Sequence, residues 1–313
     1  PIINMGVTMR IFILLIIFSN LYSNNQIPAA EQKRPILLRG GTLHTVTNGV
    51  LEETDILFSE GRIITIDQMI KPSPETDVYD IYGKHVVPGF IAAYTRIGLT
   101  EISAVKQTND HSEIGEINPN VRANVTYNTD SDLIPITRSN GILTVNSVPA
   151  SGLIPGQSSV MALDGWTWED ATLKHPAALH LNWPSMYINY NKKLKKGEKS
   201  QKTIYLETIR KLDDMVLNVK SYHHRKNAKE RKAEHKQKSD LRLESMVPFI
   251  IFQETIHIKA DDIRQIEAAI NWSNKHELNI VIVGGSDSWI NPKILVDNNV
   301  PVILLGVQKV PSR

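Results

Sequence analysis

The chain of 313 residues contains no cysteine. This absence excludes a disulfide scaffold, a cysteine-ligated zinc or iron–sulfur site and a thiol nucleophile. No apolar run reaches 18 residues, which excludes a polytopic membrane protein. Aromatic residues make up only 6% and the net charge is only +2, so the whole chain is no polyelectrolyte. Hydrophobic residues at 41% and charged residues at 22% are ordinary globular values and exclude a chain disordered throughout.

The first apolar run lies near the N-terminus. Met9 and Arg10 precede eight apolar residues, and a polar segment with small residues such as Ser23 comes next. This pattern is typical of a secretory signal peptide, and the run is too short to span a bilayer. A buried strand is the alternative interpretation. We expect residues 1–26 to be a signal peptide with upstream residues, and the protein to be secreted or periplasmic without a membrane anchor after cleavage.

Positive charge is concentrated in residues 192–242, which hold seventeen Lys or Arg against seven Asp or Glu. Apolar residues recur there at helical spacing between Thr203 and Val219. We interpret residues 190–245 as a solvated basic helical insertion, and we expect the stretch 192–242 to be dispensable for the fold. Nucleic-acid binding would require aromatic residues among the basic ones, and Tyr205 and Tyr222 are the only rings of this kind, so we expect no nucleic-acid partner.

Residues 35–85 alternate short apolar runs with turns that contain glycine. The pattern predicts strands at residues 36–46, 54–58, 62–66 and 77–82. A segment of this size buries little core alone, so we expect a small β domain that is stabilised by packing against the rest of the chain.

Five further apolar runs predict strands in the rest of the chain. They lie at residues 86–92, 142–148, 247–252, 279–283 and 300–305. Helical spacing from Ile258 to Lys275, and a shorter segment at 292–297, predicts helices between the later strands. Apolar strands that alternate with helices indicate a parallel sheet covered on both faces. No glycine fingerprint comes after a strand, which favours a (β/α) barrel over a Rossmann sheet.

Several motifs resemble the amidohydrolase superfamily. The sequence RGGTLHTV occupies residues 39–46, GKHVVPGFI occupies residues 83–91, and residues 248–305 agree with the later strands. The order of these pieces is most similar to an exported bacterial member of the imidazolonepropionase-like branch. The resemblance covers residues 35–185 and 246–313. It implies an α/β fold with an incomplete (β/α)8 TIM-like barrel of the metal-dependent-hydrolase type at residues 86–313, preceded by a small β-sandwich domain.

The resemblance implies a zinc-dependent hydrolase of C–N bonds other than peptide bonds, in cyclic or linear amides. The family's first barrel strand carries two histidines two residues apart, which face one side and bind one zinc. Here Tyr94 and Arg96 stand at these positions, and arginine has no lone pair for a metal. The other strand histidines would fall near Gln253 and residues 284–287, where no histidine occurs. We therefore expect no zinc and a catalytically impaired chain whose catalytic residues are unknown.

Two classes of function compete. The first is an impaired amidohydrolase, and the alternative is a non-catalytic homologue that binds a small molecule in the barrel mouth with Arg96 in place of the metal charge. A third class is an interaction protein that uses its basic helices against acidic partners. A homo-oligomer is compatible with the sequence. The candidate ligand-binding residues are Tyr94, Arg96, Asp110, His111, Glu113, Gln253 and Glu254; for 110–113 a solvated loop is the alternative interpretation.

We expect Arg96 to be buried at the catalytic end of the barrel. A buried guanidinium needs a counter-charge. A carboxylate of the chain, from Glu101, Asp110, Glu113 or Glu254, or an anionic ligand would supply it.

The barrel segment is short. A (β/α)8 unit takes about 250 residues. Residues 86–313 are fewer than that, and they also include the basic insertion. We expect the chain to be a fragment of a longer product.

Export is the first testable prediction. Because residues 9–23 combine one positive charge, an apolar core and small residues, we expect the mature protein outside the cytoplasm with this segment removed. Cell fractionation with N-terminal sequencing measures this. Cytoplasmic protein that keeps an intact N-terminus would contradict it.

Overall fold

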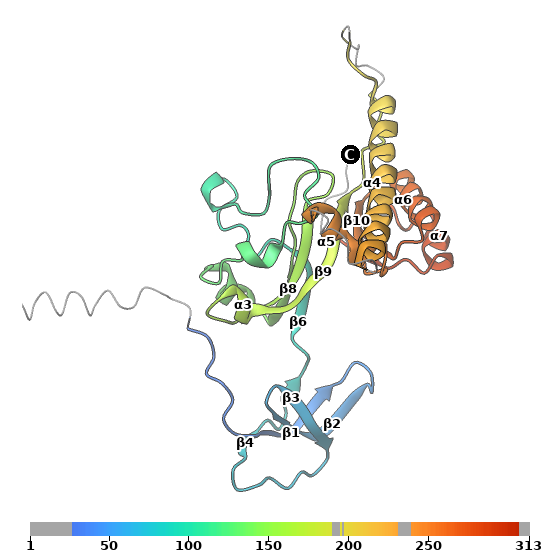
Figure 1. Cartoon of the computed structure of the whole chain (residues 1–313). Coiled ribbons are helices and arrows are strands. Elements are labelled where there is room, and N and C mark those ends of the chain that lie inside the picture. Colours follow the sequence, from blue (N-terminus) through green and yellow to red (C-terminus); the bar gives the residue numbers. More distant parts are fainter. Residues whose placement is uncertain (1–26, 190–194, 196, 231–238, 307–313) are drawn as a thin grey trace, which may run out of the picture. The chain divides into compact units, whose positions relative to one another are not determined.

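The computed structural model describes residues 27–189, 195, 197–230 and 239–306 (Figure 1). The expected signal peptide at residues 1–26 lies outside this part of the chain. Two compact units are present: the first extends to Phe90 and includes residues 141–143, and the second comprises the remainder. No helix in the described ranges has the length and apolar character needed to cross a membrane.

The first unit is built on one five-stranded sheet. Its strands are β1 (Ile36–His44), β2 (Val50–Ser59), β3 (Arg62–Asp67), β4 (Asp77–Asp80) and β5 (His85–Val86). The order is β3-β2-β1-β4, with β5 also paired to β1; β1 to β3 are antiparallel, and β4 and β5 run parallel to β1. The four strands expected here are all present. The expected sandwich is wrong for the described residues, which form a single sheet.

A buried carboxylate ties the turns of this sheet together. The side chain of Asp55 is 3% exposed and accepts hydrogen bonds from the backbone amides of Gly40 and Ile70 at 2.9 and 3.1 Å. The guanidinium of Arg39 lies 3.6 Å away. A buried charge needs this kind of compensation, so Asp55 fixes the path of the chain around β1.

The second unit contains a seven-stranded sheet. Its strands are β6 (Phe90–Thr95), β7 (Ile142–Ser147), β8 (Gly156–Ala162), β9 (Thr172–Asn182), β10 (Ile256–Ala260), β11 (Ile280–Gly284) and β12 (Val302–Leu304). They are ordered β12-β11-β10-β9-β8-β7-β6. Strands β9 to β12 are parallel, as expected, but β8 is antiparallel to both β7 and β9, which corrects the prediction of a wholly parallel sheet.

The seven-stranded sheet is strongly curved. Tyr94 of β6 and His180 of β9 have ring centroids 5.9 Å apart, although two strands separate β6 from β9 in the sheet order. Three strand spacings in a flat sheet would amount to about 14 Å. The sheet therefore curls into a barrel-like surface whose concave side carries both rings, and the fold is mixed α/β.

Helices accompany the later strands of the second unit. They are α2 (Leu133–Ser139), α3 (Trp168–Ala171), α4 (Gln201–Glu230), α5 (Leu241–Ile250), α6 (Ile263–His276) and α7 (Pro292–Asp297), with short 3-10 turns η1 (Lys106–Thr108) and η2 (Ala123–Thr126). Asp262 and Gln265 form a capping box at the start of α6.

Three of the expected elements are corrected by the structure. The run at residues 86–92 is not one strand, because Val86 ends β5 of the five-stranded sheet and Phe90 begins β6 of the seven-stranded sheet. The run at residues 247–252 is not a strand, because residues 247–250 are the last turn of α5. The helix expected from Ile258 begins at Ile263, and residues 256–260 form strand β10 instead.

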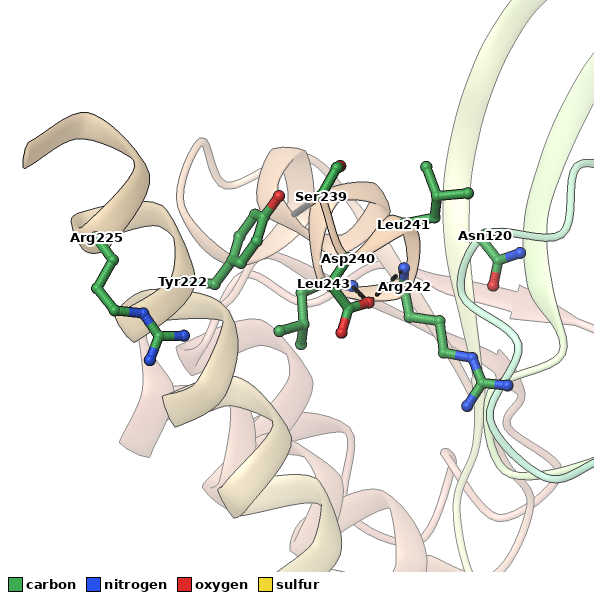
Figure 2. A pocket seen from close by; sticks show the side chains of 8 residues that line it. All are labelled: Asn120, Tyr222, Arg225, Ser239, Asp240, Leu241, Arg242 and Leu243. Carbon is green, nitrogen blue, oxygen red and sulfur yellow. Dashed lines mark hydrogen bonds between the residues drawn. The ribbon is translucent and has the colours of Figure 1, made fainter. Parts of the chain in front are cut away.

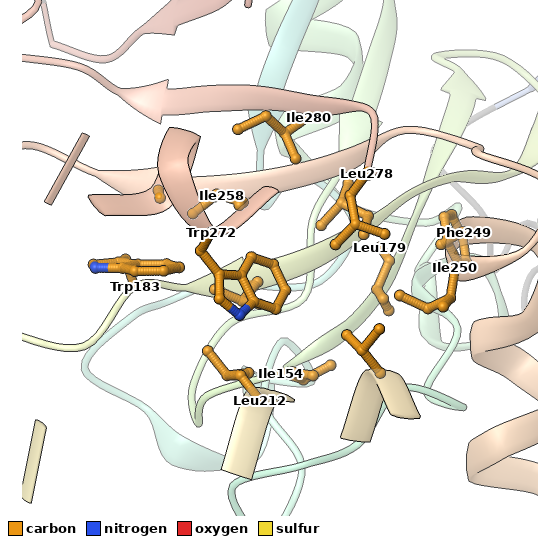
Figure 3. Close-up of a cluster of buried hydrophobic side chains, with 14 of the residues drawn as sticks. Ile154, Leu179, Trp183, Leu212, Phe249, Ile250, Ile258, Trp272, Leu278 and Ile280 are labelled. Carbon is orange, nitrogen blue, oxygen red and sulfur yellow. The ribbon is translucent and has the colours of Figure 1, made fainter. Parts of the chain in front are cut away.

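The main core lies between β9 to β11 and the helices α4 to α7 (Figure 3). Alternate residues of these strands are buried in it, because successive side chains of a strand face opposite sides. The residues that each strand contributes are Leu179 and Leu181 from β9, Ile256, Ile258 and Ala260 from β10, and Ile280 and Ile282 from β11.

Helix α4 belongs to this core, which contradicts the expectation that residues 192–242 are solvated and dispensable. Leu212, Val216, Val219 and Tyr222 lie on one face of the helix and are each at most 3% exposed. The spacing of three and four residues predicts such a face. Helix α4 therefore presents basic side chains to solvent and packs its apolar face into the core.

A polar contact also fixes α4 on α6. The carboxylate of Asp213 accepts hydrogen bonds from the Trp272 indole at 2.9 Å and the Lys275 ammonium at 2.8 Å. It also lies 2.6 Å from Nε2 of His276. Partial burial works against ionisation, but the hydrogen bonds and the charge of Lys275 outweigh it and lower the pKa of Asp213. The carboxylate therefore stays ionised and anchors the helix.

The contribution of α4 can be tested with two matched leucines of the same helix. Leu212 is 1% exposed and Leu217 is 57% exposed. We expect Leu212→Ala to lower the free energy of unfolding by about 2–5 kcal/mol, since it leaves a cavity. Leu217→Ala should change it by less than about 0.5 kcal/mol. Denaturant unfolding of both variants measures the difference; equal effects would mean that α4 covers no core.

Candidate functional site

A cavity of about 300 Å³ opens at the carboxyl ends of β6, β9 and β10. In barrels of parallel strands, binding and catalytic residues gather at this edge. The residues that line the cavity are Tyr94, Arg96, Ala150, Ser151, Asn182, Trp183, Lys259, Ala260, Asp261 and Gln265.

The register of β9 and β10 arranges the concave side of the sheet in two levels. His180 pairs with His257, and Asn182 pairs with Lys259 two residues further along. Since residues i and i+2 of a strand face the same side, each histidine lies directly below a residue that lines the cavity. The leucines and isoleucines between them face the core.

The two histidines are held as neutral rings. Their centroids are 5.0 Å apart in an edge-to-face arrangement. Burial lowers the pKa of His257 to about 4, and burial together with the neighbouring His257 holds the pKa of His180 well below its usual value. Within the part of the chain that the structure describes, Nε2 of His180 and Nδ1 of His257 have no hydrogen-bond partner. Both nitrogens remain able to bond to something bound on the concave side.

Tyr94 and Arg96 both line the cavity. Burial raises the pKa of the Tyr94 hydroxyl, and the positive charge of Arg96 partly offsets this. Arg96 is exposed to solvent rather than buried, so the expectation of a buried guanidinium is corrected. None of the ion pairs found among the described residues includes Arg96. Its solvation at the rim of the cavity makes an internal counter-charge unnecessary.

Two of the four carboxylates considered as partners of Arg96 have other contacts. Glu101 accepts hydrogen bonds from Ser131 at 2.7 Å and Asn128 at 3.3 Å. Glu113 accepts one from the amide of Ile114, the next residue in the chain.

The segment 110–113 comes after η1 and does not line the cavity. The ring of His111 is nevertheless fixed by the hydroxyl of Thr100, 2.8 Å from Nδ1. Burial and then the charge of Arg96 lower the pKa of His111, while the charge of Asp110 opposes both. The field of Arg96 therefore reaches this loop.

Gln253 and Glu254 lie far from the cavity along β10. They precede Ile256 and thus stand at the amino end of the strand, whereas the cavity is at its carboxyl end. Both are exposed. Their expected place at the site depends on a strand at residues 247–252, and because that strand is absent the placement is wrong.

The sequence interpretation missed His180, Asn182, His257 and Lys259. The signal that could have located them is the strict alternation in residues 179–182 and 256–260, where each polar residue comes after an apolar one. Such alternation is typical of a strand with one face in the core and one face on a polar concavity.

Asp261 brings a carboxylate to the same edge. Its Oδ1 accepts a hydrogen bond from the hydroxyl of Ser286 at 2.9 Å. Gly284 makes this approach feasible: its φ is 99°, and a Cβ at that position would lie 2.5 Å from Oδ1 of Asp261. A glycine at the end of β11 is therefore required by the packing of the carboxylate.

The residues present do not fit a resident zinc ion. Zinc takes three or four protein ligands, and no group of three His, Asp or Glu side chains suited to a metal occurs in the described ranges. The two imidazoles carry ligand atoms on the concave side, the carboxylate of Asp261 already accepts the hydroxyl of Ser286, and Lys259 stands one level above the imidazoles. Arg96 and Lys259 offer no lone pair to a metal while they are charged, and they repel a cation.

A larger cavity of about 790 Å³ lies between α4 and the start of α5. Figure 2 shows Tyr222 and Arg225 on one side of it and the first residues of α5 on the other. The carboxylate of Asp240 in its lining caps α5 by accepting hydrogen bonds from the amides of Arg242 and Leu243. The one carboxylate of its lining is thus engaged with the helix end, so this cavity is a weaker candidate than the one at the strand ends.

No protein-family model and no curated protein matches the sequence. Among solved structures, an amidohydrolase from Thermotoga maritima MSB8 is similar, with a TM-score of 0.76 and 23% identity over 89% of this chain and 72% of that chain. At this identity the likeness shows a shared fold.

Two further solved structures are much less similar. One is a Xaa-Pro dipeptidase with bound methionine in the active site, at a TM-score of 0.43 and 11% identity over 86% of this chain and 66% of that chain. The other is a β-aspartyl dipeptidase from Fervidobacterium islandicum AW-1, at a TM-score of 0.35 and 12% identity over 89% of this chain and 77% of that chain. These TM-scores are too low to support an argument about this chain.

The neutral state of His257 can be tested by NMR. Because burial lowers its pKa to about 4, we expect its ring resonances to stay unchanged until the pH approaches that value. The unfolded chain takes up this proton near pH 6.5. The free energy of unfolding should therefore fall as the pH is lowered from about 6.5 towards 4, and less steeply in His257→Gln. Titration of the wild-type ring near pH 6.5 would contradict the burial.

Proposed function

We propose that this chain is an amidohydrolase-fold protein that binds a small molecule in the cavity at the strand ends, without metal-dependent hydrolysis. The observation that carries the proposal is the pair of cationic side chains, Arg96 and Lys259, in the cavity where metal-dependent relatives would need metal ligands. Arg96 takes the place of a histidine in the motif that resembles the family, and its fixed positive charge takes the place of the metal charge.

Membership of the amidohydrolase superfamily is part of this proposal, and so is the finer assignment to the imidazolonepropionase-like branch. The shared fold supports the superfamily. The motifs at residues 39–46 and 83–91 support it independently, because they precede the first barrel strand in the family's order.

The competing function is hydrolysis of an amide C–N bond by a metal-activated water. One observation favours it: His180 and His257 stand at matching positions of adjacent parallel strands with unpartnered ring nitrogens. Two imidazoles are fewer ligands than a catalytic zinc takes, and the cationic Lys259 stands next to them. This function would require further ligands, so we rank it second.

Metal analysis and ligand screening together distinguish the two functions. We expect purified protein to retain far less than about one equivalent of zinc, and a screen of small molecules to raise its melting temperature. Ala150→Phe, which fills the cavity, should abolish that rise. Ala104→Phe, on an exposed loop, is the matched control and should preserve it. About one equivalent of tightly held zinc with amidase activity would overturn the proposal.

A further inference from the structure

The two cationic side chains of the cavity have no ion-pair partner in the described ranges. Arg96 directly follows β6 and Lys259 lies on β10; both line one cavity of about 300 Å³ and are exposed. None of the ion pairs in the described ranges involves either of them. Two like charges that share a small concavity repel each other, and this repulsion is relieved when an anion binds between them.

Three of the remaining polar groups of the cavity are engaged with the protein. The amide nitrogen of Gln265 lies 3.1 Å from the carbonyl oxygen of Pro184, and that of Asn182 lies 2.8 Å from the carbonyl oxygen of Gly152; each donates to its oxygen. Asp261 accepts the hydroxyl of Ser286. The guanidinium of Arg96 and the ammonium of Lys259 are the two cations of the lining, and hydrogen bonds to charged groups are the stronger ones.

The level below adds hydrogen-bonding capacity without charge. His180 and His257 lie one step deeper on the concave side, and each has a ring nitrogen without a partner in the described protein. Neutral imidazoles can donate or accept a hydrogen bond according to their tautomer. They leave the positive charge at the rim as the dominant feature of the cavity.

We propose that the ligand of this cavity is a small oxyanion, a carboxylate or a phosphate ester, held between the guanidinium of Arg96 and the ammonium of Lys259. This inference rests on the proposed small-molecule binding at the same site. A guanidinium matches a planar carboxylate or a phosphate through two parallel hydrogen bonds, and an ammonium adds a point charge. Asp261 stands at the same edge and directs the anionic group away from itself.

The test compares charged probes with a neutral counterpart of the same shape. Benzoate, benzamide and inorganic phosphate are titrated into the full chain, and binding is followed by chemical shifts or calorimetry. We expect benzoate or phosphate to bind roughly tenfold or more tightly than benzamide, because a hydrogen bond to a charged group is stronger than one between neutral groups. Added salt should weaken this binding.

Variants identify the groups responsible. Arg96→Gln and Lys259→Gln should each weaken anion binding roughly tenfold or more. Lys174→Gln removes an exposed cation from the amino half of β9 and should leave it unchanged. Asp261→Asn removes a negative charge that repels the anionic ligand at the edge of the cavity, and it should strengthen anion binding. Because Arg96 and Lys259 are exposed, we expect the variants to fold. An unchanged melting temperature is the control for this.

The outcomes separate this inference from the proposed function. Equal affinity for benzoate and benzamide, both lost in Ala150→Phe, would overturn the oxyanion inference and leave small-molecule binding standing. No binding by either anion would overturn the inference as well. Tightly held zinc together with absent probe binding would overturn both. If phosphate alone binds, the ligand is a phosphate ester, and if benzoate alone binds, it is a carboxylate.

Discussion

The second unit depends on the burial of one face of β9, β10 and β11 under the helices. The apolar side chains of this face interlock with α4, α5 and α6 in a continuous core. Because a strand alternates its side chains, fixing this face also fixes which residues point to the concave side. A shift of one residue in β10 would bring Lys259 into the core and Ile258 into the cavity. The packing of the core therefore determines the geometry of the candidate site.

Helix α4 is part of the same constraint, despite its basic composition. Its inner face covers β9 and its neighbours, and the carboxylate of Asp213 fixes it to α6 through three donors of that helix. The long side chains of lysine and arginine on its outer face remain solvated. The basic composition of the stretch comes from its solvent-exposed side chains and gives no sign of the buried face. Composition alone therefore suggests a dispensable insertion.

Elements with a uniform pattern could be predicted from the sequence. The strands of the small β domain, β11 and α7 all lie where the apolar runs and turn signals indicate them. The elements that contribute residues to the candidate site could not be predicted in this way, for a physical reason. Residues 256–260 alternate apolar with polar side chains because one face lines a polar concavity, so they do not form a continuous apolar run. Residues 247–252 do form such a run, but periodicity does not distinguish a short buried helix from a strand.

The candidate site could accordingly be located only in part. Tyr94 and Arg96 are predictable because they lie in a segment that resembles a family motif, whereas their position relative to β9 and β10 requires the curvature of the sheet. Lys259 and the two histidines require the register of β9 with β10, which no local pattern specifies.

The charges of the cavity form a consistent arrangement. A zinc site binds a cation with neutral imidazoles and carboxylates, and the cation then attracts an anionic or polarised ligand. Here Arg96 and Lys259 carry fixed positive charge at the rim, while burial keeps His180 and His257 neutral beneath them. A protein that keeps its own cations at this position can attract an anion without a metal. The same cations oppose metal binding by the histidines below, so Arg96 and Lys259 together favour an anion over a cation in the cavity.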